Sequence, residues 1–278
     1  MGRIESDYYN FMDYDPVLTR KVLSYYVPMF AGRSPVLELG CGRGEFLELL
    51  TGAGIKASGI DNDEGMVELA RASGVEVAVG DAVEALHVDP APGPYGGIFC
   101  SHFLEHLPTE SVQRVLEGVR RTLQPGGTFI AVVPNPACYS VLSRDFWRDP
   151  THVRFYEPSL IAFLCTQAGL TVESIGENPQ NHPGPPPENL PEQRTFVHPG
   201  LEDAIQEWLR LASNHSGIRL PGRGKAEWEQ VGALSHLLSM LNERLTEIGE
   251  ALRSFEHIYS KMLWTMYPSN DVYVVARG

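Results

Sequence analysis

The sequence has no paired cysteines, no cluster of basic residues and no long apolar run, and each absence excludes a class of protein. Its four cysteines are scattered without a C-x-x-C spacing, so we expect free buried thiols rather than disulfides or a zinc site. No apolar run approaches the roughly 18 residues of a membrane span. The first residues are polar and acidic, unlike a secretory signal. We therefore expect a cytoplasmic protein with no membrane span.

Basic residues are outnumbered, because 22 Lys and Arg stand against 35 Asp and Glu, a formal net charge of −13. Proteins that grip nucleic acid usually present a basic face, so a nucleic-acid partner is not expected. The length of 278 residues and the hydrophobic content of 43% suit one large core with an appendage.

A glycine-rich turn is the most informative feature that is present. An apolar strand at 35–39 runs into Gly40, Gly42 and Gly44, and a helical pattern follows at 44–53. Strand, glycine turn and helix bring bare backbone against a nucleotide-like ligand, because glycine has no Cβ. A dinucleotide fingerprint would need a third glycine at position 45, where Glu45 stands.

Three acidic residues accompany this turn. Glu38 lies inside the strand, where a carboxylate repels a pyrophosphate but attracts a cation. Asp61 ends the next apolar run, 21 residues after Gly40, near the spacing that places a carboxylate on a ribose hydroxyl. Asp81 follows a third strand-like run. The alternative is a sheet whose glycines only form tight turns.

These residues resemble the class I S-adenosylmethionine (SAM) methyltransferases. The matching motifs, in family order and spacing, are Glu38-Leu-Gly-Cys-Gly-Arg-Gly44, Gly59-Ile-Asp61, Gly80-Asp81-Ala82 and Leu123-Gln-Pro-Gly-Gly127. The resemblance covers roughly residues 30–178 and the C-terminal strand. It implies that the glycines underlie the methionine part of SAM, Asp61 binds the ribose, and Asp81 and Ala82 border the adenine. The cofactor-binding residues it implies are Glu38, Gly40, Gly42, Gly44, Asp61, Asn62, Asp81, Ala82 and Ser101.

The alternation of strand and helix patterns predicts a parallel α/β sheet. We expect strands at 35–39, 56–60, 75–79, 96–100, 128–133, 170–176 and 272–276. Helices are expected at 44–53, 63–72, 109–123 and 159–168. The resemblance implies a Rossmann-like class I methyltransferase fold, with a mostly parallel seven-stranded sheet, an antiparallel last strand and a helical insertion before it.

The chain outside this core is expected to be helical. The predicted organisation is a helical lid at 1–34, the SAM-binding core at 35–177, a proline-rich linker with a helical insertion at 178–270, and the final core strand at 271–278. A long helix near 226–264 carries an apolar heptad seam, formed by Leu234, Leu238, Leu241, Leu245, Ile248, Leu252, Phe255, Tyr259 and Met262. Such a seam favours a coiled coil and a homo-oligomer. The alternative is an amphipathic helix that lies on the core.

A histidine cluster follows the fourth strand, where ligands of such sheets lie. His102, Glu105 and His106 share one face if this stretch is helical, and His152 follows the fifth strand at the same edge. We take His102, His106 and His152 as candidate catalytic residues, and all four as candidate metal ligands. Histidine acting as a base without metal, and a purely structural role, are the alternatives.

The cluster resembles the Glu-x-x-Glu-His sites of metal-dependent small-RNA 2′-O-methyltransferases and of ubiquinone-pathway O-methyltransferases. That resemblance implies a divalent metal such as Mg²⁺ or Mn²⁺. The chain departs from the pattern because His102 replaces the first Glu, and added imidazole suits Mn²⁺ better than Mg²⁺.

The acceptor is indicated by the segment 146–170, which resembles methyltransferases encoded with bacterial surface-glycan synthesis. The resemblance implies O-methylation of a sugar or glycan hydroxyl. Two alternatives stay open. One is 2′-O-methylation of an RNA 3′ end, which the net charge disfavours. The other is a SAM-binding scaffold that regulates a glycan-assembly complex.

Overall fold

The computed structural model describes residues 14–89, 92–182, 210, 225–266 and 268–278. The chain divides into two compact units. The first comprises Met1–Gly184 with Met266–Gly278, and the second is Pro185–Thr265. Each unit is described by itself.

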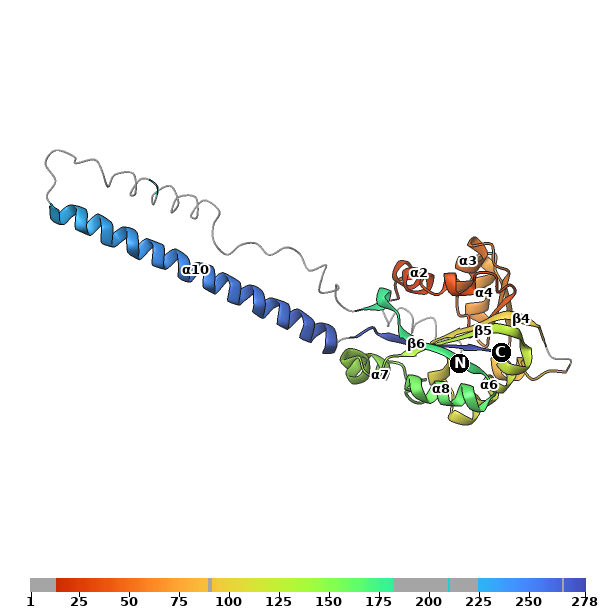
Figure 1. The fold of residues 1–278 in the computed structure, drawn as a ribbon. Coiled ribbons are helices and arrows are strands. Elements are labelled where there is room, and N and C mark those ends of the chain that lie inside the picture. The colour runs from red at the N-terminus through yellow and green to blue at the C-terminus, as the bar shows by residue number, and fades with distance from the viewer. Residues whose placement is uncertain (1–13, 90–91, 183–209, 211–224, 267) are drawn as a thin grey trace. The chain divides into compact units, whose positions relative to one another are not determined.

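The first unit is built on a seven-stranded sheet (Figure 1). In chain order its strands are β1 (Val36–Leu39), β2 (Ala57–Asp61), β3 (Glu76–Val79), β4 (Tyr95–Ser101), β5 (Leu123–Pro134), β6 (Thr171–Glu177) and β7 (Asp271–Arg277). The spatial order is β3-β2-β1-β4-β5-β7-β6. Strands β1 to β5 pair in parallel, and β7 pairs antiparallel with both β5 and β6. The predicted fold is confirmed, including the antiparallel last strand.

One strand differs from its expected bounds by more than one residue at an end. β5 begins at Leu123, five residues before the predicted 128, because Leu123 pairs with Tyr95 ahead of an irregularity in the β4–β5 ladder. The preceding helix consequently ends at Thr122.

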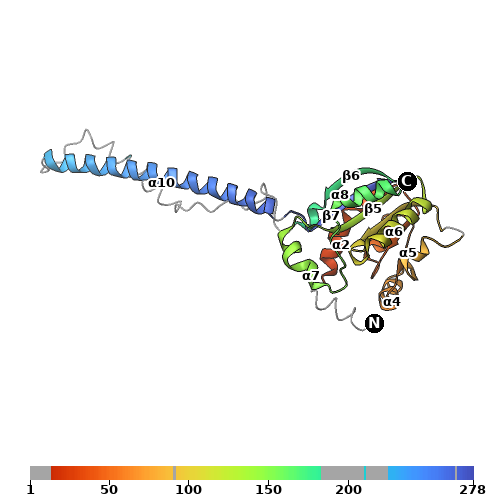
Figure 2. The ribbon, with the colours of Figure 1, turned by 90° about the horizontal axis from the view of Figure 1, so that it is seen from below.

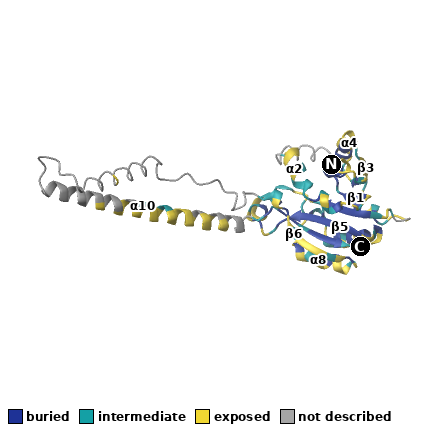
Figure 3. Ribbon diagram, turned by 45° about the horizontal axis from the view of Figure 1, so that its top comes forward, coloured by how far each residue is buried: buried dark blue, intermediate teal, exposed yellow. Residues whose placement is uncertain are grey.

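Side chains of the central strands alternate between two buried faces, as the two-residue period of a strand requires. On β5, Phe129 and Ala131 belong to one core cluster, and Ile130 and Val132 belong to the other. Figure 3 shows this strand buried along the sheet. Both faces are therefore covered, as a mostly parallel sheet needs.

Helices cover both faces (Figures 1 and 2). The helical elements of this unit are α2 (Pro16–Ser24), η1 (Val27–Phe30), α3 (Glu45–Gly52), α4 (Glu64–Ala72), α5 (Ala82–Ala85), η2 (Leu104–His106), α6 (Thr109–Thr122), η3 (Val141–Asp145), α7 (Phe146–Arg148), α8 (Pro158–Gln167) and η4 (Pro179–Asn181). α6 and α8 supply the apolar side chains of one cluster, and α3 with η1 supplies the other.

Helix α2 begins with a proline in its first turn and an acidic residue at its N-cap. Pro16 occupies the first turn, where its missing N–H costs nothing, and the Asp15 carboxylate accepts hydrogen bonds from the N–H groups of Val17 and Leu18. Of the predicted lid at 1–34, residues 1–13 lie outside the described part of the chain.

The described part of the second unit is essentially one helix. α10 (Lys225–Met266) has 42 residues and agrees closely with the helix predicted near 226–264. Several apolar side chains of the predicted seam are exposed, from 38% for Leu252 to 64% for Phe255 (Figure 3). The coiled coil itself stays a prediction. The linker and the expected helix at 201–213 fall almost entirely outside the described residues.

Among the described residues, none of the helices combines the length and the apolar character that crossing a membrane requires.

Candidate functional site

The glycine turn after β1 has the backbone that only glycine adopts readily. Gly40, Gly42 and Gly44 have φ values of 66°, 48° and 81°. A Cβ on Gly40 would lie 2.7 Å from Cδ2 of Phe103. The turn is held by Asp61, whose Oδ2 accepts a hydrogen bond of 2.8 Å from the N–H of Gly42. The sequence motif thus forms a fixed, bare-backbone cradle.

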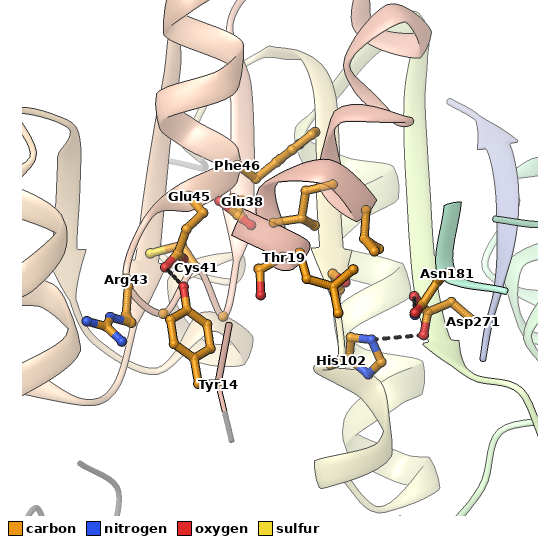
Figure 4. Close-up of a pocket in the computed structure, with 16 residues that line it drawn as sticks. Tyr14, Thr19, Glu38, Cys41, Arg43, Glu45, Phe46, His102, Asn181 and Asp271 are labelled. Atoms are coloured by element: carbon orange, nitrogen blue, oxygen red, sulfur yellow. Dashed lines mark hydrogen bonds and ion pairs between the residues drawn. The ribbon is translucent and has the colours of Figure 1, made fainter. Parts of the chain in front are cut away.

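A pocket of about 300 Å³ opens beside this cradle (Figure 4). It lies where β1 and β4 end, at the point where the strand order reverses, which is the usual ligand position in such sheets. Its lining residues are Tyr14, Leu18, Thr19, Val22, Leu23, Glu38, Gly40, Cys41, Gly42, Arg43, Glu45, Phe46, Ser101, His102, Asn181 and Asp271. Helix α2, the glycine turn and the start of β7 therefore enclose one space.

The carboxylate of Glu38 is unusual in this pocket. The residue is only 5% exposed, and its Oε2 is buried with no hydrogen-bond partner among the described residues. Burial, followed by the negative charges of Glu45 and Asp61, raises the pKa of Glu38 well above its usual range. A cationic ligand would satisfy this carboxylate, and SAM carries both an ammonium and a sulfonium group. The cradle and the unpaired acid therefore fit SAM.

The predicted cofactor residues do not all line the pocket. Glu38, Gly40, Gly42 and Ser101 do so, whereas Gly44, Asp61, Asn62, Asp81 and Ala82 do not. Gly44 is the remaining member of the glycine turn, at the N-cap of α3.

The two acids outside the pocket are engaged with backbone. Asp61 Oδ1 accepts from the N–H of Asp63, and Asp81 caps α5 by accepting from Val83 and Glu84. Carboxylate oxygens keep a second lone pair, so these contacts leave both acids able to accept from ribose or adenine groups. Their roles in SAM binding stay predictions.

Three of the four predicted metal ligands come together. Ligand atoms of Glu105, His106 and His152 all lie within 4.8 Å of one another. The two chain segments are joined by backbone, because the carbonyl of Glu105 accepts a hydrogen bond of 2.8 Å from the N–H of Val153. Glu105 is fully buried, and its Oε2 has no hydrogen-bond partner within the described part of the chain. We call Glu105, His106 and His152 the Glu–His–His cluster.

Hydrogen bonds set the tautomers of both imidazoles in the cluster. The hydroxyl of Thr151 donates to Asp149 Oδ1 at 2.5 Å, so it accepts from His106 Nδ1 at 2.8 Å. His152 Nδ1 donates to the carbonyl of Phe146 at 2.6 Å. With Nδ1 carrying the hydrogen, it is Nε2 of each ring that can bind a metal.

The pKa of His106 supports the neutral form. Burial lowers this pKa below its usual value, and the neighbouring His152 acts in the same direction against the opposing charge of Glu105. The residues present therefore fit a divalent cation with mixed imidazole and carboxylate ligands.

His102 lies apart from these ligands. Its Nδ1 is 3.1 Å from Glu105 Oε1, and its Nε2 is 3.2 Å from Asp271 Oδ1 (Figure 4). Partial burial lowers the pKa of His102, whose side chain is still 47% exposed, but the charges and hydrogen bonds of Asp271 and Glu105 raise this pKa well above its usual range. The backbone of His102 is left-handed, with a φ of 50°, which is unusual for a residue other than glycine. The structure does not bring His102 into the Glu–His–His cluster.

Two acids of this region carried no sequence signal as site residues. Asp271 begins β7 and is 2% exposed, yet it lines the SAM pocket beside His102. Asp149 has its Oδ2 3.7 Å from His152 Nε2. Asp149 lies in the segment that the sequence singled out for His152. Asp271 follows a long insertion, so no local pattern could place it here.

Comparison with known proteins agrees with this geometry. Residues 13–175, more than half of the chain, match the model of a family described as a methyltransferase domain. The chain belongs to the class I SAM-dependent methyltransferases.

Two curated relatives of this methyltransferase share one name. The ubiquinone biosynthesis O-methyltransferase of Methylococcus capsulatus (strain ATCC 33009 / NCIMB 11132 / Bath) is 36% identical over 171 residues, which cover 54% of this chain and 69% of that protein. The protein of the same name from Pseudomonas aeruginosa (strain LESB58) is 29% identical over 154 residues, 50% of this chain. The match spans 66% of the Pseudomonas protein, slightly less than two thirds of its length.

Solved structures share the fold. A SAM-dependent methyltransferase from Archaeoglobus fulgidus has a TM-score of 0.61 at 23% identity, with 97% of each chain covered. The magnesium protoporphyrin IX methyltransferase from Synechocystis PCC 6803 with bound SAH has a TM-score of 0.51 at 17% identity, covering 64% of this chain and 89% of that one.

Proposed function

We propose that this methyltransferase transfers the methyl group of SAM to a hydroxyl oxygen, with the help of a divalent cation held by the Glu–His–His cluster. The observation that carries the proposal is the arrangement of the cluster: a buried carboxylate oxygen with no hydrogen-bond partner among the described residues, and two imidazoles whose Nδ1 atoms are hydrogen-bonded so that each can offer Nε2. Both of these relatives are named as O-methyltransferases, which supports the choice of oxygen.

The reaction requires that the acceptor oxygen be aligned with the methyl carbon of SAM and that one proton be removed from the acceptor hydroxyl. The acceptor oxygen bonds to the methyl carbon while the carbon–sulfur bond breaks, and S-adenosylhomocysteine leaves with the electron pair. Glu38 and the glycine cradle hold the methionine end, so the methyl group is presented toward the ends of β4 and β5. A divalent cation held by Glu105, His106 and His152 would lower the pKa of the acceptor hydroxyl, so that its proton could pass to water.

The imidazoles offer a second route for the proton. A bare Nε2 on His106 or His152 accepts a proton directly when it is not ligating. This base mechanism is the alternative to cation assistance, and both use the same atoms. Sensitivity to chelation separates them.

For the acceptor we propose a sugar or glycan hydroxyl, on the resemblance of segment 146–170. Trp147 supports a ring-shaped acceptor, because its side chain is 68% exposed and its ring lies next to Phe146, which stacks on His152. Phe146 and Tyr156 are buried, so they pack the loop and do not contact an acceptor. The relatives' names favour a second candidate, a hydroxyl on a ubiquinone precursor.

We also propose the predicted domain arrangement, in which α2 serves as a lid over the SAM pocket. Side chains of α2 line that pocket, and Arg20 of α2 forms an ion pair of 2.8 Å with Glu48 of α3. For α10 we propose self-association through the heptad seam, because six of its apolar side chains between Leu241 and Met262 are exposed.

The test is methyl transfer from labelled SAM to two panels of acceptors, saccharides and dihydroxylated aromatic rings, with and without EDTA. The proposal expects transfer to a hydroxyl, loss of activity with EDTA and recovery with Mn²⁺ or Mg²⁺. Transfer to no hydroxyl acceptor contradicts O-methylation. Transfer that is unaffected by EDTA excludes a role for the cation and favours the base mechanism.

A further inference from the structure

Three side chains link the start of the last strand to the Glu–His–His cluster. Asp271 Oδ1 lies 3.2 Å from Nε2 of His102, and Nδ1 of the same ring lies 3.1 Å from Glu105 Oε1. The two carboxylates are almost fully buried, at 2% and 0% exposure. We call Asp271, His102 and Glu105 the carboxylate clamp.

Within the clamp, His102 has no nitrogen left for a metal. Imidazole binds a cation through the lone pair of an unprotonated nitrogen, but both nitrogens of His102 face carboxylate oxygens at hydrogen-bond distance. The left-handed backbone of His102, with φ of 50°, sets the direction in which its side chain leaves the main chain. The ring therefore spans the two acids, and the sequence-based assignment of His102 as a ligand does not follow from this geometry.

The contact with His102 occupies only one of the two carboxylate oxygens of Glu105. Its Oε1 is held by His102, and its Oε2 is buried with no hydrogen-bond partner among the described residues. A carboxylate fixed at one oxygen presents the other in one direction. That second oxygen keeps both of its lone pairs for a cation at the Glu–His–His cluster.

Asp271 is in turn held by residues that flank the second unit, Pro185–Thr265, which we call the insertion here. Asn181, just before the insertion, donates from Nδ2 to Asp271 Oδ2 at 2.5 Å. Ser269, just after the insertion, places its Oγ 3.3 Å from the N–H of Asp271 and donates to the carbonyl of Asn178 at 2.6 Å. Asp271 is thus fixed from both ends of the inserted segment.

We propose that Asp271 is a positioning residue that acts through His102 to orient the Glu105 carboxylate for the cation. This inference rests on the proposed function, because it presumes a cation at the Glu–His–His cluster. It assigns His102 to the support of the ligands, and it makes the two ends of the insertion part of the catalytic apparatus.

The test measures Mn²⁺ binding to the full chain, by calorimetry and by counting imidazole ligands from the nitrogen modulation of the Mn²⁺ electron spin echo. Asp271→Asn removes the negative charge at position 271 and keeps the shape of that side chain. His102→Gly removes the ring, and glycine accepts the positive φ without strain. Asp89→Asn is the matched control, because Asp89 is exposed and precedes β4 at the opposite end of that strand.

We expect both clamp variants to bind Mn²⁺ about 10- to 100-fold more weakly, the usual cost of losing an outer partner of a metal ligand. The control should bind as the unaltered protein does. Two imidazoles should be counted in the unaltered protein and in His102→Gly alike. Added imidazole should restore part of the affinity of His102→Gly by filling the vacated space.

Three results overturn the inference. Unchanged Mn²⁺ affinity in both clamp variants shows that the clamp does not orient Glu105, while the proposed function stands. A count of three imidazoles that falls to two in His102→Gly makes His102 a ligand. Absence of Mn²⁺ binding to the unaltered protein removes the cation, and with it both the clamp and the metal-assisted form of the proposed function.

Discussion

Replacing Glu38 by Gln should weaken SAM binding while it stabilises the ligand-free protein. The carboxylate is buried and its Oε2 has no partner among the described residues, so ionised Glu38 opposes folding until a cation arrives. A hydrogen bond to a charged group contributes about 1.5–3 kcal/mol. Loss of that contribution corresponds to roughly 10- to 150-fold weaker binding, at about 1.4 kcal/mol per factor of ten.

The pH dependence of this effect has a definite sign. Because burial raises the pKa of Glu38 above its unfolded value, the ligand-free fold loses stability as pH rises from the unfolded pKa toward the folded one. Glu38→Gln should lack this loss, so its melting temperature should exceed that of the unaltered protein most at neutral pH. SAM affinity of the unaltered protein should fall on acidification, as the carboxylate takes up a proton.

The assay is calorimetric titration with SAM and with S-adenosylhomocysteine, which keeps the ammonium group but lacks the sulfonium charge. Equal weakening for both ligands places Glu38 on the ammonium, and weakening for SAM alone places it on the sulfonium. Glu68→Gln is the control, because Glu68 is an exposed acid of α4 that does not line the pocket. Unchanged affinity of Glu38→Gln for both ligands refutes the reasoning.

Three further predictions test other parts of the account. Gly40→Ala should weaken SAM binding at least 10-fold, because its Cβ meets the Phe103 ring at 2.7 Å and φ is 66°; titration with SAM checks this, and normal affinity contradicts it. His106→Ala should lower kcat by about 100-fold or more and abolish Mn²⁺ binding, with SAM affinity retained. If the variant keeps the kcat of the unaltered protein, both with and without EDTA, then His106 takes no part in the chemistry. Leu252→Asp should convert the expected oligomer into a monomer, because it places a charge on the exposed seam of α10; light scattering coupled to gel filtration measures this, and an unaltered protein that is already monomeric contradicts the coiled coil.

The fold was predictable because its signals are local. Alternating apolar patterns, the glycine turn and the acids that end successive strands each depend on a few neighbouring residues, and the known order of such motifs supplies the topology. The bounds of β5 were missed by five residues because its first residue pairs across an irregularity that no single-strand pattern reveals.

The Glu–His–His cluster was partly predictable. The ends of parallel strands meet at one edge of the sheet, so His152 could be placed near Glu105 and His106 from topology alone. The position of His102 could not, since its ring direction depends on a left-handed backbone and on Asp271. Asp271 reaches the site only because β7 returns antiparallel beside β5 after the insertion, a contact that no local sequence pattern encodes.

The most direct test of the central claim is an anomalous difference map at the manganese absorption edge, from crystals of the full chain grown with Mn²⁺ and S-adenosylhomocysteine. The account predicts one strong peak within ligand distance of Glu105, His106 and His152, next to the sulfur of the bound product. A map with no peak at this cluster, in crystals where the product is clearly bound, would contradict cation-assisted methyl transfer.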